Sequence, residues 1–310
     1  MTFVQALTGY VTIGVLILVG VVCGHFGVLT TQHQRMLSKT ALLVASPALM
    51  VMLMSRADLS HVFARSVYAS YGAIAGSALV YTVLAFAVFR TDLAGRTIGT
   101  LLSCYSNAGN IGIPVAMYAL GDATWAAPIL LVQVAVMQPI GLAVLDYCKA
   151  RDNGARIPLL GLLSLPLRNP LTVGCLTGLA LNLLGLTVPR LIATPLDMLG
   201  GMAVPSMLLA LGISLRLEPR PSRNAESAES ATVIGLKCLV QPGIAYLLGR
   251  ALGLPGEAVR AVTILAALPP AQNVHVIATR YGVRELFARD AVFRATMVSA
   301  VVILVLVTVL

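Results

Sequence analysis

The chain has 310 residues, of which 58% are hydrophobic and only 11% are charged, whereas a soluble domain carries about 25% charged residues. This composition excludes an ordinary water-soluble fold, and the continuous apolar runs exclude a transmembrane β-barrel, whose strands alternate apolar and polar positions. The formal net charge is +9, but the basic residues are spread over short loops instead of one face of a soluble domain, which excludes nucleic-acid binding.

Charges and Pro/Gly clusters divide the chain into ten apolar segments. Most are close to the roughly 20 residues that a helix needs to cross a hydrocarbon core about 30 Å thick. No charged residue precedes the first segment, so we expect a retained helix there and not a secretory signal. The sequence predicts an all-α polytopic membrane protein with helices near 3–23, 37–55, 66–89, 97–120, 123–147, 169–188, 196–215, 231–250, 259–280 and 290–310.

Lys and Arg are distributed unevenly between the loops. The loops after the first, third, fifth, seventh and ninth segments hold 15 of them, and the loops after the even-numbered segments hold 5. Cytoplasmic loops retain positive charge. We therefore expect the odd-numbered loops in the cytoplasm and both termini outside the plasma membrane, which in a bacterium is the inner membrane.

The two halves of the chain resemble each other. A shift of 158 residues lays Gly20 on Gly178 and Pro47 on Pro205. Each half then has five helices, an odd number, so the second half is inverted relative to the first, as in many secondary transporters. The predicted halves are residues 1–150 and 169–310, joined by a basic cytoplasmic connection at 151–168.

The fourth helix of each half is interrupted by polar and helix-breaking residues. Residues 102–114 read LSCYSNAGNIGIP, and residues 265–275 read LAALPPAQNVH. Proline removes a backbone N–H and clashes with the preceding turn, and glycine lowers helix stability by about 1 kcal/mol. In a membrane such breaks persist only inside the protein or beside a water-filled cavity. The two breaks therefore predict a site.

A broken helix offers unpaired N–H groups and the positive end of its dipole, which favour a carboxylate. Asn107 and Asn110 are three residues apart, which places them on one face of a helix. Their amides, and those of Gln272 and Asn273, can donate to a carboxylate and accept from a hydroxyl without the cost of a buried charge. The predicted substrate site comprises Asn107, Gly109, Asn110, Gly112, Gln272 and Asn273, with helix breaks at Pro114, Pro269 and Pro270.

Other interpretations of these residues remain open. The amides and prolines can simply fix helix kinks, while the glycines allow close helix packing. His275 is either a proton relay or a neutral buried side chain. Asp146, Asp197 and Lys237 are placed near predicted helix ends, where a charged group reaches the interface by default.

An enzyme is a less favoured reading. Five cysteines without a C-x-x-C pair indicate no metal site, and nothing in the sequence indicates a cofactor. The sequence also contains no G-x-S-x-G, no H-E-x-x-H and no pair of carboxylates inside the membrane, so no catalytic residues are predicted.

Several motifs together resemble the auxin efflux carrier family, which includes bacterial malonate and malate permeases and the plant auxin exporters. The resemblance covers nearly the whole chain. It rests on SPAL at 46–49, SNAGNIGIP at 106–114, NP at 169–170, AVP at 203–205, ALPPAQN at 267–273 and IATRYG at 277–282.

The resemblance implies a fold like that of the bile-acid/sodium symporters, with the fourth and ninth helices crossing at their breaks. It further implies a homodimer through the first, second, sixth and seventh helices, which form a scaffold. The remaining helices would form a transport part that exports a small organic anion by an elevator-type movement. A sodium- or proton-coupled carboxylate importer on the same fold is the alternative.

Overall fold

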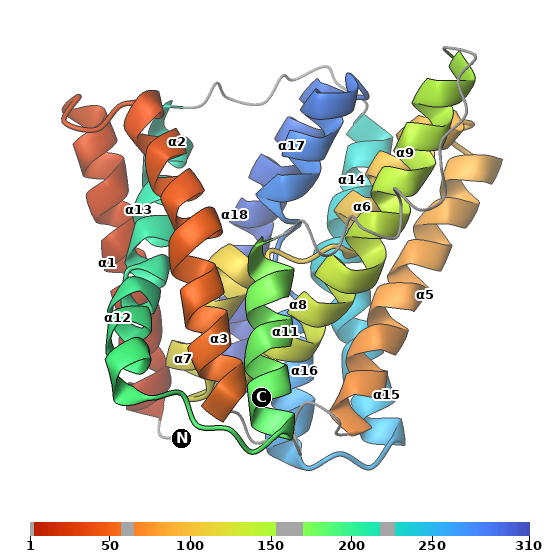
Figure 1. The fold of residues 1–310 in the computed structure, drawn as a ribbon. Helices are drawn as coiled ribbons and strands as arrows, with labels where there is room; N and C mark the ends of the chain where they lie inside the picture. The colour runs from red at the N-terminus through yellow and green to blue at the C-terminus, as the bar shows by residue number, and fades with distance from the viewer. Residues whose placement is uncertain (1–2, 57–64, 153–169, 218–226) are drawn as a thin grey trace. The chain divides into compact units, whose positions relative to one another are not determined.

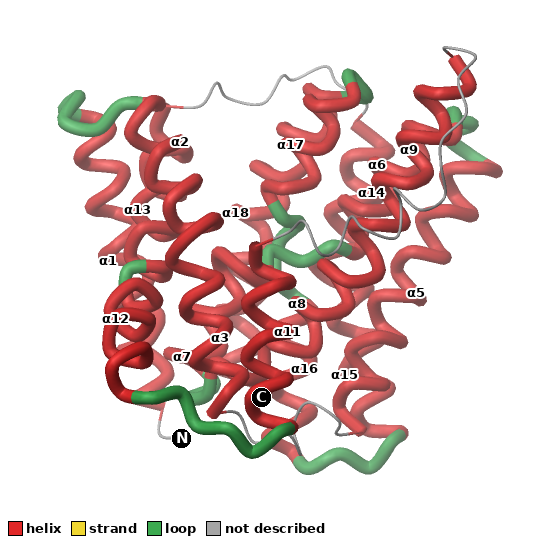
Figure 2. Tube along the Cα trace, viewed as in Figure 1, coloured by secondary structure: helices red, strands yellow, loops and turns green. Residues whose placement is uncertain are grey.

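The computed structural model describes residues 3–56, 65–152, 170–217 and 227–310, and every regular element in these ranges is a helix (Figure 2). One isolated antiparallel β-bridge joins Ser106 and Pro270. The prediction of an all-α chain is therefore confirmed. The predicted connection at 151–168 lies outside the described residues, apart from its first two positions.

Five helical stretches in the described part of the chain are long and apolar enough to cross a membrane. They coincide with the second, third, seventh, eighth and tenth predicted segments, and the other five predicted segments are helical as well. The chain is therefore a membrane protein. The five stretches are Thr31–Arg56, Arg65–Ala87, Arg190–Leu217, Ala228–Ala251 and Glu285–Val309.

The bounds of the helices follow the chain order (Figure 1). The first half contains α1 (Phe3–His25), α2 (Thr31–Thr40), the π-helical turn η1 (Ala41–Ala45), α3 (Ser46–Arg56), α5 (Arg65–Ala87), α6 (Leu93–Cys104), η2 (Ala108–Gly112), α7 (Ile113–Ala119), η3 (Ala123–Ala126), α8 (Ala127–Val132), η4 (Gln133–Met137) and α9 (Gln138–Asp152). The second half contains α11 (Pro170–Leu183), α12 (Arg190–Gly201), α13 (Ala203–Leu217), α14 (Ser227–Gly235), η6 (Leu236–Val240), α15 (Gln241–Ala251), α16 (Gly256–Ala266), α17 (Gln272–Tyr281) and α18 (Glu285–Val309).

These helices gather into two compact units, and each unit draws on both halves of the chain. The first unit contains α1 to α3, η3, α7 and α11 to α13, and the second contains the other α-helices. The units comprise Met1–Val62, Gly109–Ala127 and Pro166–Pro219 in the first, and Phe63–Ala108, Pro128–Leu165 and Arg220–Leu310 in the second.

Small residues bring the helices of the first unit into backbone contact. α1 lies along α13 and α11 lies along α3. A methyl group on Gly178 of α11 would lie 2.5 Å from the Val51 carbonyl oxygen, and one on Gly20 of α1 would lie 3.0 Å from Cα of Gly212. Lipid is as apolar as these side chains, so close packing of this kind holds membrane helices together.

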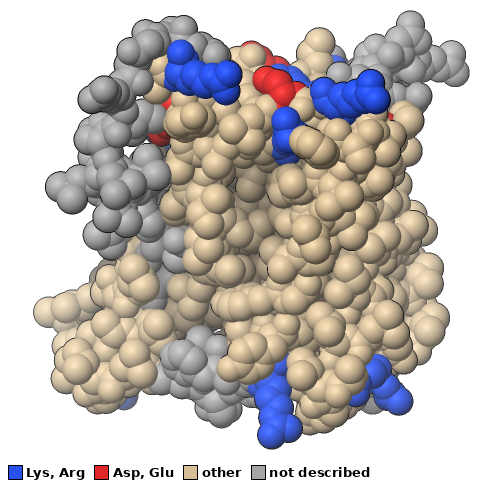
Figure 3. All heavy atoms as spheres, turned by 90° about the vertical axis from the view of Figure 1, so that its right-hand side faces the viewer, with Lys and Arg blue, Asp and Glu red and all other residues tan. Residues whose placement is uncertain are grey.

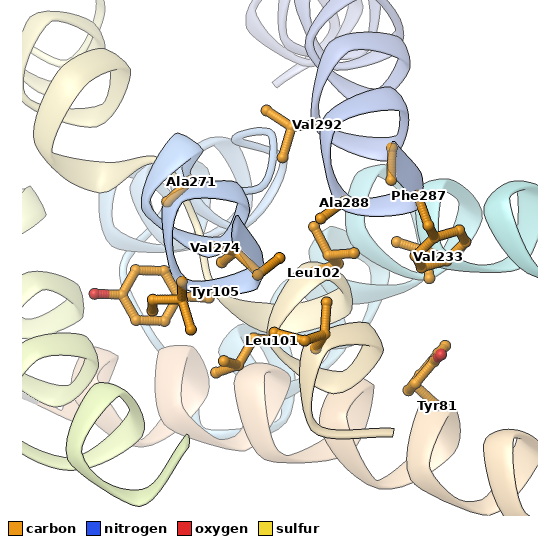
Figure 4. Close-up of a cluster of buried hydrophobic side chains, with 14 of the residues drawn as sticks. Tyr81, Leu101, Leu102, Tyr105, Val233, Ala271, Val274, Phe287, Ala288 and Val292 are labelled. Atoms are coloured by element: carbon orange, nitrogen blue, oxygen red, sulfur yellow. The ribbon is translucent and has the colours of Figure 1, made fainter. Parts of the chain in front are cut away.

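The core of the second unit lies where α5, α6, α14, α17 and α18 meet. In the close-up, side chains from all five helices point toward one another (Figure 4). Tyr81, Leu102, Val233, Val274 and Ala288 are each fully buried there. This cluster packs directly against the residues at which α6 ends, and so fixes the position of the site.

The outer surface carries the apolar residues that lipid requires. Large hydrophobic side chains such as Leu191, Met198 and Val301 are more than half exposed. On the face shown in Figure 3, the charged side chains lie at the two ends, and the band between them shows none. This distribution is the one expected of helices whose middle portions lie in hydrocarbon.

Candidate functional site

Two helices of the second unit stop at neighbouring places in space. α6 ends at Cys104, and the chain is not helical again until η2 begins at Ala108. α16 ends at Ala266, and α17 begins at Gln272. The prediction that residues 102–114 and 265–275 interrupt their helices is therefore confirmed.

The two interruptions pair with each other through their backbones. The N–H of Asn107 donates to the Pro269 carbonyl at 2.7 Å, and the N–H of Ala271 donates to the Tyr105 carbonyl at 2.9 Å. Together they form the isolated bridge of the fold. Backbone groups freed by a helix break inside a membrane need partners within the protein. Here each break provides partners for the other.

A lysine completes the end of α16. In a continuous helix the N–H of residue 270 would bond to the Ala266 carbonyl, but residue 270 is a proline and has no N–H. Lys237, in η6, donates from Nζ to this carbonyl at 2.7 Å. The ammonium group therefore replaces the backbone donor that the proline lacks.

Two serines serve neighbouring carbonyls in the same way. Ser299 of α18 donates from Oγ to the Ala267 carbonyl at 2.5 Å, and Ser77 of α5 donates to the Ser103 carbonyl at 2.9 Å. Both carbonyls lack their usual helical donors, because the N–H groups four residues further on form the backbone pairing between the two breaks. Three helices outside the breaks thus satisfy the helix ends.

The predicted residues of the first break fall in two kinds of structure. Asn107 is buried in the non-helical stretch, so the argument that its spacing places it on one helix face with Asn110 does not hold. Gly109, Asn110 and Gly112 lie in η2, and Pro114 lies in the first turn of α7. The boundary between the two units falls after Ala108, so these four positions belong to the first unit.

The predicted residues of the second break lie together at the start of α17. Pro269 and Pro270 are buried and form the bridge, and Gln272 and Asn273 begin the helix with partly buried side chains. Ala271, which precedes α17, has no side chain that can cap it. The N-terminal N–H groups of α17 therefore face the break without a side-chain acceptor from that position, as a site for an anion requires.

Two polar atoms near the breaks are buried and have no hydrogen-bond partner among the described residues. They are Oγ of Ser106, at the bridge itself, and Nδ1 of His275, in the first turn of α17. An unpaired buried polar atom is costly. Such atoms are plausible ligand contacts, and Ser106 was not among the predicted site residues.

The structure corrects the expectation for Lys237. This residue was expected to reach the membrane interface from a helix end, but it lies near the middle of the Ala228–Ala251 stretch and its side chain is 0% exposed. Asp197, by contrast, is exposed and pairs with Arg56 at 2.9 Å, and Asp146 accepts a hydrogen bond from Tyr281 at 2.6 Å. The position of Lys237 within an apolar run was the signal that should have indicated burial.

The whole chain matches a known protein family. A family model described as "Membrane transport protein" matches residues 6–153 and 159–307. The match covers both halves of the chain and includes both helix breaks.

Individual relatives are more distant. A protein of Rhizobium meliloti (strain 1021) with "malonate transporter" in its name is 28% identical over 235 residues, which are 72% of this chain and 71% of the relative. An uncharacterized transporter of Methanothermobacter thermautotrophicus is 26% identical over 302 residues, 97% of each chain. An uncharacterized transporter of Escherichia coli (strain K12) is 24% identical over 275 residues, 87% of this chain and 86% of the relative.

Proposed function

The chain belongs to the membrane transport protein family, the auxin efflux carriers that its motifs resemble, and we propose that it is a secondary transporter for a small organic carboxylate. The observation that carries this proposal is the backbone pairing between the two broken helices, at Asn107 with Pro269 and Tyr105 with Ala271. Paired breaks place helix ends and polar groups in the interior of a membrane protein, where transporters bind their substrates.

The chemistry of the break at α17 favours an anion. The N-terminal end of a helix carries a partial positive charge and free N–H groups. Gln272 and Asn273 lie in this first turn, and Asn107 is buried at the pairing. In the proposed site, these amides and those of Asn110 bind the carboxylate, and Gly109 and Gly112 allow the backbone close to it.

The grouping of helices supports an elevator-type movement. The first unit contains the helices proposed as the scaffold, and the second contains both paired breaks. The glycine contacts within the first unit are also reciprocal: Gly20 packs α1 on α13, and Gly178, its counterpart in the repeat, packs α11 on α3. In the proposed mechanism the second unit carries the anion outward across the plasma membrane, while the scaffold forms a homodimer.

A transport assay with malonate tests the proposal, because one relative is named for malonate. Purified protein is reconstituted into liposomes, and efflux of radiolabelled malonate is compared with protein-free liposomes and with malonamide, its neutral analogue. We expect malonate or another small dicarboxylate to stabilise the protein against heat and to cross the membrane, whereas malonamide does neither. Failure of every carboxylate in a panel of mono- and dicarboxylates to bind or cross would refute the proposal.

A further inference from the structure

Lys237 differs from the other buried charged residues of the described chain. Three charged side chains are buried there: Glu229, Lys237 and Asp290. Glu229 pairs with Arg284 at 2.6 Å, and Asp290 pairs with Arg289 at 2.7 Å. No Asp or Glu among the described residues pairs with Lys237, whose printed hydrogen bond goes to a backbone carbonyl. The second unit therefore holds an ammonium group without an acidic partner.

The position of this ammonium group is also specific. It lies at the C-terminal end of α16, where helix carbonyls carry a partial negative charge, and the Ala266 carbonyl accepts from it at 2.7 Å. In secondary transporters the carbonyls at such helix ends and unwound stretches coordinate Na⁺. Lys237 thus contacts the kind of group that would otherwise bind a coupling cation.

We propose that the ammonium group of Lys237 is a built-in substitute for a coupling cation, so that the carrier binds its carboxylate without Na⁺. This inference rests on the proposed function and names the charge that balances the anion. The cation lies on one side of the break, at the end of α16, and the anion binds on the other, at the start of α17. In an interior of low dielectric constant their attraction is strong, and the substrate supplies the negative charge that Lys237 lacks.

This proposal separates two readings that the sequence leaves open. A sodium-coupled importer needs a vacant cation site at the crossing, and in this chain a covalently attached cation occupies the carbonyl. Because Lys237 cannot dissociate, the free energy of a sodium gradient cannot be transferred to the substrate through this position.

The first experiment uses the wild-type protein in detergent and needs no variant. Malonate affinity is measured by calorimetry in choline chloride and in sodium chloride at equal ionic strength. We expect dissociation constants that agree within about twofold, since a 1.4 kcal/mol difference corresponds to a factor of ten. An affinity more than tenfold higher in sodium chloride would overturn the inference while supporting the proposed function.

The second experiment separates charge from structure. We expect Lys237→Met, which keeps the apolar stem, to weaken malonate binding more than tenfold and to reduce the preference for malonate over malonamide. Lys237→Arg should retain most of both. Ser299→Ala is the matched control, because it removes the hydrogen bond to the adjacent Ala267 carbonyl without removing a charge. It should lower the melting temperature but leave malonate affinity within about threefold.

A chemical rescue gives an independent test. In Lys237→Ala, n-butylammonium should restore malonate binding, whereas n-butanol, similar in shape but neutral, should not. Unchanged malonate affinity in Lys237→Met, or an equal loss in Ser299→Ala, would show that Lys237 is only a structural cap and would overturn the inference. If wild-type protein binds no carboxylate, the proposed function and this inference both fail.

Discussion

Arg284 donates from both terminal nitrogens to the two carboxylate oxygens of Glu229, at 2.6 and 2.7 Å, with both side chains largely buried. Tyr81 adds a hydrogen bond to the same carboxylate at 2.5 Å, and the Phe287 ring lies 3.9 Å from the guanidinium carbon. This cluster joins α5, α14 and the start of α18, three helices of the second unit. It therefore fixes the frame that holds the paired breaks.

Removal of one partner of this pair should destabilise the protein. Glu229→Ala leaves the Arg284 guanidinium buried without its carboxylate, which costs about 3–5 kcal/mol, and we expect a clear fall in melting temperature. Asp197→Ala breaks the exposed pair with Arg56 and should cost no more than about 1 kcal/mol. Thermal unfolding followed by intrinsic fluorescence checks both. Equal melting temperatures for the two variants would contradict the buried pair.

A single methyl group should disturb the first unit. Gly178→Ala places Cβ 2.5 Å from the Val51 carbonyl oxygen, so α11 and α3 must move apart, at a cost of about 1–3 kcal/mol. Gly243→Ala is the control, because nothing lies within 4 Å of its new Cβ and the substitution favours the helix. Melting curves should show destabilisation for Gly178→Ala alone. A similar response at both positions would argue against close packing of α11 on α3.

Two amides should matter for binding and a third only for stability. Asn110→Ala and Asn273→Ala should each remove a hydrogen bond to a charged group, worth about 1.5–3 kcal/mol, or roughly ten- to hundredfold in malonate affinity. Asn182→Ala removes the hydrogen bond from Nδ2 to the Met54 carbonyl, 2.8 Å long and away from the breaks. It should leave affinity unchanged. Wild-type affinity in both site variants would leave the amides a purely structural role.

The charge distribution predicts the orientation in the membrane. In a cysteine-free background, a cysteine at position 149 should react with a membrane-impermeant thiol reagent only from the cytoplasmic side, and one at position 190 only from outside. Both native residues, Lys149 and Arg190, are exposed, so access depends on sidedness and not on burial. The opposite labelling pattern would invert the predicted topology.

The sequence predicted the helices and their two interruptions, because both depend on local composition. Apolar runs determine where helices cross the membrane, and Pro269 and Pro270 cannot continue a helix whatever surrounds them. The sequence did not reveal which groups satisfy the broken ends. Ser77, Lys237 and Ser299 come from other helices, and only the packed structure brings them to the carbonyls.

The same distinction explains the error at Asn107. Its spacing from Asn110 assumes a helix that continues through the break, and Tyr105 instead adopts an extended conformation with φ −87° and ψ 99°. The partner that imposes this conformation is Pro269, more than 150 residues away in the chain. No local pattern contains that information.

The backbone pairing between the two breaks also constrains how the protein is made. While the ribosome has delivered only the first half, the N–H of Asn107 and the carbonyl of Tyr105 have no partners, because Pro269 and Ala271 have not yet been synthesised. Unpaired backbone groups are expensive in hydrocarbon, so the half-made chain must keep this stretch near water or against the insertion machinery. A message truncated after the first half would leave these groups exposed permanently, which marks such a product for degradation.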